Sequence, residues 1–102
     1  MESPNAYYED LAGRLYGLVI RLAGRLPPDQ ARWLHHMIEV GEYGLALEDM
    51  AGMLAHGKSA ITGAGREDML ALAGRMKLEG GLVPRALAAC PQAGEDHGAG
   101  SR

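Results

Sequence analysis

The stretch LAGRLYGLVIRLAGRL, residues 11–26, indicates the fold class of this chain of 102 residues. Its leucines recur at steps of three or four residues, which places them on one stripe of an α-helix. We therefore expect a long helix over Ala6–Leu26 whose leucine stripe faces a core. The stripe consists of Leu11, Leu15, Leu18, Leu22 and Leu26. Pro27 and Pro28 end this helix and begin the next, because proline is tolerated in a first helical turn.

Three further segments show the same helical spacing. We expect helices over Asp29–Val40, from the turn at Gly41–Gly44 to about His56, and over Arg66–Glu79, with a connector at residues 57–65 and one more turn at Val83–Leu87. The expected fold is all-α: a small helical bundle of four main helices with a short C-terminal turn. Residues 1–90 are expected to form a single domain, and the polar, glycine-rich residues 91–102 a flexible, disordered tail.

The amino-acid composition is typical of a helical protein and argues against several classes of binding partner. Phe is absent and Val and Ile together number only six, whereas strands favour β-branched and aromatic residues. A net charge of −3 argues against nucleic acid as the partner. No apolar run approaches the roughly 20 residues that span a bilayer, and a single cysteine allows no internal disulfide. We expect a cytoplasmic protein that does not bind membranes.

The chemically active residue types do not form a catalytic or metal-binding pattern. His35 and His36 diverge by about 100° on a helix, and His35 with Glu39 is interpreted as an exposed surface pair. Cys90 is interpreted as a packing residue, and Trp33 as a residue of the core or of a groove. We therefore expect no catalytic residues, no metal, no cofactor and no enzymatic activity.

The charge pattern is the most informative feature. Residues 37–56 hold four acidic residues and neither Lys nor Arg. Glu42, Leu45, Glu48 and Asp49 are expected on the side of the third helix away from the core, with Glu39 at the edge. An apolar residue inside a polar rim is typical of a protein-binding surface. The alternative is a solvated acidic face, with Leu45 covered by another helix.

Three glycines form another stripe on the first helix, opposite the leucines. They are Gly13, Gly17 and Gly24. Because a glycine inside a helix costs about 0.5–1 kcal/mol relative to alanine, this stripe indicates either the close approach of another backbone or simple tolerance of glycine. The first possibility predicts a homo-oligomeric or scaffold protein, in the simplest case a homodimer.

The run IEVGEYGLALE, residues 38–48, resembles the MafI-like immunity proteins of bacterial polymorphic toxin systems. The similarity extends loosely over residues 30–80, although the proline usual in the loop before the last helix is missing. It implies a small cytoplasmic helical protein that neutralises a toxin, often a nuclease, by binding it. The implied partner is a basic toxin domain, contacted by the acidic residues around Leu45. Tyr43 and Gly44 are expected to be structural residues at the seam between the second and third helices.

Overall fold

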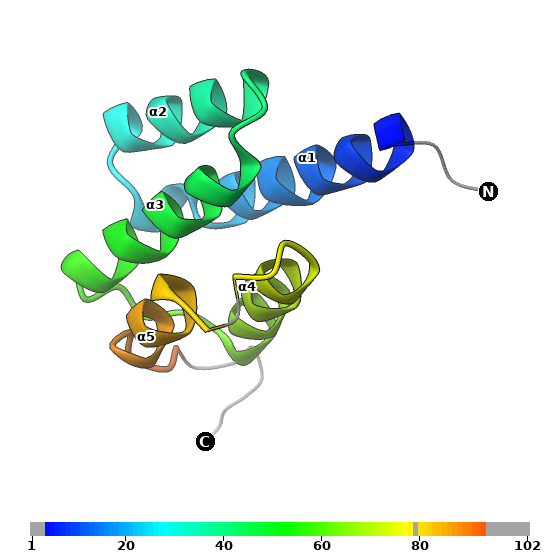
Figure 1. Ribbon diagram of the computed structural model, residues 1–102. Helices are drawn as coiled ribbons and strands as arrows, with labels where there is room; N and C mark the ends of the chain where they lie inside the picture. The colour runs from blue at the N-terminus through cyan, green and yellow to red at the C-terminus, as the bar shows by residue number, and fades with distance from the viewer. Residues whose placement is uncertain (1–3, 79, 94–102) are drawn as a thin grey trace.

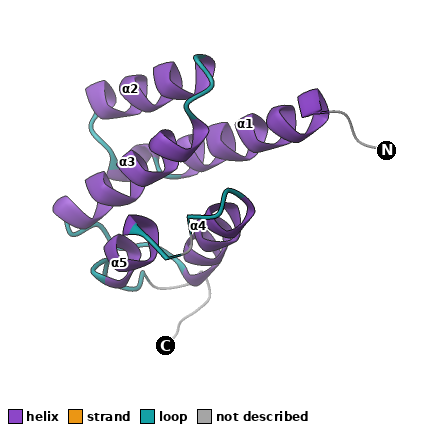
Figure 2. Cartoon of the chain, in the orientation of Figure 1, coloured by secondary structure: helices purple, strands orange, loops and turns teal. Residues whose placement is uncertain are grey.

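The computed structural model describes residues 4–78 and 80–93 of the chain (Figure 1). These residues form helices joined by short loops, with no strand among them (Figure 2). The helices are α1 (Pro4–Arg21), the 3-10 turn η1 (Ala23–Arg25), α2 (Pro28–Glu39), α3 (Tyr43–His56), α4 (Gly63–Arg75) and α5 (Leu82–Ala88). The all-α class is confirmed.

Helix α3 lies at the centre of the molecule. It contacts α1, α2, α4 and α5, and in Figure 1 α2 lies above it while α4 and α5 lie below. Because other helices surround it, α3 buries one whole stripe of apolar side chains. This stripe consists of Ala46, Leu47, Met50, Ala51 and Leu54, each 0% exposed, and its members recur at the three- and four-residue steps of an α-helix.

The leucine stripe of residues 11–26 is buried along its full length, although the first helix is shorter than predicted. The α-helix ends at Arg21 and continues as η1. Leu26 adopts extended backbone angles (φ −124, ψ 134), because the following proline disfavours the helical conformation of the residue before it. Leu22 and Leu26 nevertheless remain buried, so the 3-10 turn keeps the stripe in the core.

The second half of the chain differs from prediction at helix ends. Helix α4 begins at Gly63, three residues before the predicted start, because the Thr62 hydroxyl accepts a hydrogen bond from the Gly65 amide at 3.0 Å and caps the helix. It ends at Arg75, and Lys77 then takes a positive φ of 61°. The predicted end, residue 79, lies outside the described residues.

The predicted turn at Val83–Leu87 is a fifth helix, α5, which spans seven residues. Val83 and Leu87 are buried, and α5 packs against α3 and α4. The Arg66 side chain from α4 donates hydrogen bonds to the carbonyl oxygens of Leu87 and Cys90. These bonds satisfy carbonyls at the end of α5 that have no partner within the helix.

Residues 91–93, assigned to the tail by sequence, pair with the connector before α4. The Ile61 amide donates to the Pro91 carbonyl at 3.0 Å, and the Ala93 amide donates to the Ile61 carbonyl at 2.7 Å. Ile61 and Ala93 are both buried. The packed part of the chain therefore reaches at least Ala93, and the rest of the predicted tail lies outside the described residues.

Candidate functional site

One face of α3 points away from the core and carries the residues predicted to bind a partner. Leu45 is 44% exposed on this face, so no other helix covers it. Glu42, immediately before the helix, is exposed, while Glu48 and Asp49 are half-buried. Because a helical turn takes about 3.6 residues, Leu45 adjoins both Glu48 and Asp49 on the helix surface.

Trp33 on α2 extends this face, and it was not predicted there. The residue was expected in the core or in a groove, but its side chain is 46% exposed. Its indole Nε1 donates a hydrogen bond to Asp49 Oδ2 at 2.9 Å, and its ring lies 5.9 Å from that of His36. The bond orients both Trp33 and the Asp49 carboxylate. We call Trp33, Glu42, Leu45, Glu48 and Asp49 together the acidic face.

A shallow hollow of about 340 Å³ borders the acidic face along α3 toward α5. Glu48 and Asp49 line one part of it, while Met53 and the exposed Leu82 of α5 line another. The acidic face therefore combines two exposed apolar side chains, Trp33 and Leu45, with a recess beside them that has both acidic and apolar walls.

Glu39 was predicted at the edge of this surface, and its side chain is exposed at the end of α2. It is separated from Trp33 by six positions, which corresponds to roughly 120° around the helix. Burial raises the pKa of the Tyr16 hydroxyl on α1, and the negative charge of Glu39 raises it further. Tyr16 also packs against His35, with ring centroids 5.2 Å apart. Glu39 is therefore near α1, while Asp49 meets α2 at Trp33.

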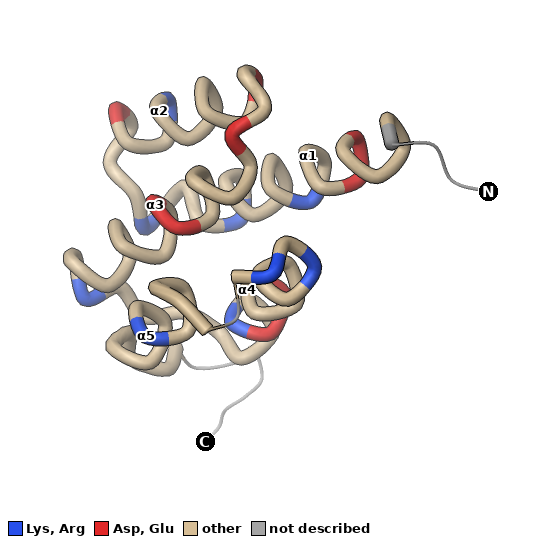
Figure 3. The backbone as a smooth tube through the Cα atoms, viewed as in Figure 1, with Lys and Arg blue, Asp and Glu red and all other residues tan. Residues whose placement is uncertain are grey.

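The acidic face carries charge that the rest of the described chain does not neutralise. In residues 4–78 and 80–93, the ion pairs are Asp10 with Arg14, Asp10 with Arg75, and Arg21 with Asp68. All of these side chains come from α1 and α4, and no described Lys or Arg lies on α3 itself (Figure 3). The carboxylates of the acidic face therefore remain available to a basic partner.

Tyr43 and Gly44, predicted as structural residues at the seam of α2 and α3, also adjoin other parts of the fold. The Tyr43 ring stacks on that of Tyr8 from α1, with centroids 5.9 Å apart. A Cβ added at Gly44 would meet Leu78 Cδ1 at 3.5 Å, an ordinary contact. Both residues therefore face neighbours other than α2.

The glycine stripe of α1 faces no backbone of the described chain. A Cβ built at Gly13, Gly17 or Gly24 meets no atom within 4 Å. Gly24 moreover belongs to η1 and not to α1. A close approach at this stripe would therefore have to come from another molecule.

Cys90 and the possible metal ligands offer no reactive cluster in the part of the chain that the structure describes. Cys90 is buried, and burial raises the pKa of its thiol while the charge of Arg66 lowers it by less. A raised pKa leaves less of the reactive thiolate at neutral pH. No group of three or more His, Cys, Asp or Glu is placed to hold a metal ion among the described residues. Nor is any described helix both long and apolar enough to cross a lipid bilayer.

Comparison of the chain with protein-family models, with curated proteins and with solved structures gave no match.

Proposed function

We propose that this protein is a non-catalytic protein-binding module that uses the acidic face to bind and neutralise a basic toxin domain, as a cytoplasmic immunity protein. The observation that carries this proposal is the pairing of exposed apolar side chains with unneutralised carboxylates. Trp33 and Leu45 are 46% and 44% exposed, and Asp49 bonds directly to the Trp33 indole.

The apolar and charged parts of the acidic face would contribute differently to binding. Tryptophan is enriched among the residues that contribute most to binding energy, and the hydrogen bond to Asp49 lowers the cost of ordering Trp33. The carboxylates of Glu42 and Glu48 would steer a positively charged partner and raise its association rate. A nuclease fits this requirement, because it needs a basic surface to hold phosphates.

The experiment compares charge reversals on two surfaces. The partner is captured from extracts of the source cells, purified, and titrated calorimetrically with the wild type, with the double variant Glu42→Lys/Glu48→Lys, and with the control Glu67→Lys. Glu67 is an exposed acidic residue on α4, so its reversal changes charge outside the acidic face.

We expect the double variant to lose about 3 kcal/mol of binding energy, or about 100-fold in affinity, with the wild-type circular dichroism spectrum retained. Affinity for the Glu67→Lys variant should stay close to that of the wild type. Equal affinities of the wild type and the double variant would refute the proposed site. A partner domain that carries net negative charge would refute the electrostatic part of the argument.

Self-association through α1 is the second candidate function, and the open space around Gly13 and Gly17 favours it. It predicts a dimer whose population rises with protein concentration and falls on Gly17→Leu, while Glu48→Lys has no effect. Sedimentation velocity over a range of concentrations separates the two functions, because neutralisation of a toxin requires no dimer.

A further inference from the structure

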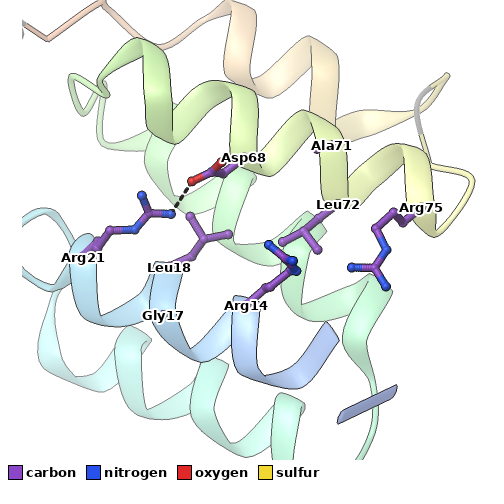
Figure 4. Close-up of a pocket in the computed structure, with 8 residues that line it drawn as sticks. All are labelled: Arg14, Gly17, Leu18, Arg21, Asp68, Ala71, Leu72 and Arg75. Atoms are coloured by element: carbon purple, nitrogen blue, oxygen red, sulfur yellow. Dashed lines mark hydrogen bonds and ion pairs between the residues drawn. The ribbon is translucent and has the colours of Figure 1, made fainter. Parts of the chain in front are cut away.

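A groove of about 390 Å³ runs between α1 and α4, away from the residues of the acidic face (Figure 4). Its floor is apolar: Leu18 from α1 and Leu72 from α4 project toward each other and are 1% and 3% exposed. Gly17, which has no side chain, and Ala71, which has only a methyl group, also line the groove. Because a Cβ at Gly17 meets no atom within 4 Å, there is free space directly above this part of α1.

The rim of the groove is basic. Arg14 and Arg21 of α1 and Arg75 of α4 line it, against one lining carboxylate, Asp68. Arg21 donates to Asp68 at 2.7 Å, while Arg14 and Arg75 share one oxygen of Asp10, at 2.9 Å and 2.6 Å. In Figure 4 the Arg14 and Arg75 guanidinium groups lie on either side of Leu72.

These arginines retain donors for a further anion. A guanidinium group has five N–H donors, and Arg14 uses only Nε on Asp10, while Arg75 uses only one terminal nitrogen. The three cations of the rim exceed the two carboxylates that pair with them. The remaining donors can therefore bind a second carboxylate or a phosphate oxygen.

Size limits the occupant. Small-molecule sites usually measure about 300–1,000 Å³, and the volume of this groove lies at the low end of that range. An occupant that packs on Gly17 and Ala71, above the buried Leu18 and Leu72, and also reaches the arginines must be both apolar and anionic.

We propose that the groove between α1 and α4 binds a small amphipathic anion, namely an alkyl chain that lies over Gly17 and Ala71 and carries a carboxylate or phosphate head group held by Arg14 and Arg75. Asp10 competes with the head group for the same two guanidinium groups. This site is independent of the acidic face.

The first experiment is a calorimetric titration of the full chain with decanoate, below the concentration at which this probe forms micelles. Decyl phosphate replaces the head group, decanol removes the charge, and acetate removes the chain. We expect saturable 1:1 binding of decanoate or decyl phosphate, with the tighter of the two identifying the head group. Decanol and acetate should each bind at least about tenfold more weakly, because each lacks one of the two interactions.

Variants then locate the site. Gly17→Leu fills the groove and should abolish binding, whereas Gly13→Leu makes the same change at an exposed position of α1 that does not line the groove. Arg14→Gln/Arg75→Gln should weaken binding by about tenfold or more. Asp10→Asn should strengthen binding, because it frees both guanidinium groups from their competitor. Circular dichroism and urea unfolding of each variant establish that it folds.

Three results would overturn the proposal. The first is decanoate binding that persists in folded Gly17→Leu, and the second is decanol binding as tight as that of decanoate. The third is that neither anionic probe shows saturable binding. If Gly17→Leu then also removes a dimer, the groove belongs to the interface with a second copy of the chain. Because Glu42→Lys/Glu48→Lys leaves the groove intact, failure here does not affect the proposed function of the acidic face.

Discussion

Two leucines on α3 allow a sharp test of how this helix divides its residues between the core and the surface. Leu45 and Leu47 lie two positions apart, and their side chains are 44% and 0% exposed. Leu45→Ala and Leu47→Ala are the same chemical change in the same helix, so any difference in helix propensity cancels. Leu47→Ala should therefore lower the stability of the fold, whereas Leu45→Ala should weaken binding of the partner.

The expected sizes follow from burial. Truncation of a fully buried leucine to alanine costs about 2–5 kcal/mol, and Leu47 contributes to the core around the central helix. A loss of about 3 kcal/mol corresponds to a fall in Tm of about 12–24 °C for a domain of this size. For Leu45, nearly half of whose surface is already in water, the loss should stay below about 1 kcal/mol.

Urea unfolding monitored by circular dichroism measures both stability losses, and titration with the purified partner measures affinity. Leu47→Ala should lower the free energy of unfolding and leave the affinity of the folded fraction close to that of the wild type. Leu45→Ala should do the reverse, with an affinity loss of about tenfold or more if it is a central contact. Equal stability losses would show that Leu45 packs in the core and would refute its assignment to the acidic face.

Substitutions at four further positions test the local structure. Thr62→Ala should lower the free energy of unfolding in urea by about 1 kcal/mol, because it removes the cap of α4, whereas Thr62→Ser should retain most of it. Gly41 has a φ of +85°, so Gly41→Ala should destabilise the fold by about 1–2 kcal/mol. Gly52 lies within α3, where a Cβ meets no atom within 4 Å, so Gly52→Ala should stabilise it by about 0.5–1 kcal/mol. A Gly52→Ala variant less stable than Gly41→Ala would contradict these backbone assignments. Arg14, and after it Arg75, hold the pKa of Asp10 below its ordinary value of 3.8, so these contacts stabilise the fold above about pH 4 and are lost as the pH falls through the lowered value. Asp10→Asn should therefore reduce the fall in Tm between neutral and acidic pH. The same fall in Tm in Asp10→Asn and the wild type would rule out a contribution of the Asp10 ion pairs to stability.

Much of the fold could be predicted because hydrophobic spacing is a local property of a helix. The stripe from Leu11 to Leu26 and the stripe from Ala46 to Leu54 are both buried, as their periodicity predicted. The start of α4 is also encoded locally, in the capping pair of Thr62 and Gly65, although the neighbouring glycines favour a loop over this segment. The end of α4 differs from the prediction because the chain turns at Lys77, which has a φ of 61°, before it reaches Gly80 and Gly81.

The candidate site could be predicted only in part. Leu45, Glu48 and Asp49 lie on one helix, so their spacing alone places them together. Trp33 and Glu39 both lie on α2, and the direction in which each points depends on how α2 packs. That packing brings Trp33 to Asp49, so a contact residue was missed, and it leaves Glu39 near enough to Tyr16 for its charge to raise the pKa of that hydroxyl.

The sequence by itself determined which segments become helices, which stripe of each is apolar, and that acidic charge concentrates at residues 37–56. Each of these properties depends on residues separated by at most a few turns along the chain. The tertiary structure alone decided that α3 is the central helix, that Trp33 joins the acidic face, and that arginines from α1 and α4 meet across an apolar groove. Arg14 and Arg75 are 61 positions apart in the sequence, and both reach the same Asp10 oxygen only because the fold places α1 and α4 along the two sides of one groove.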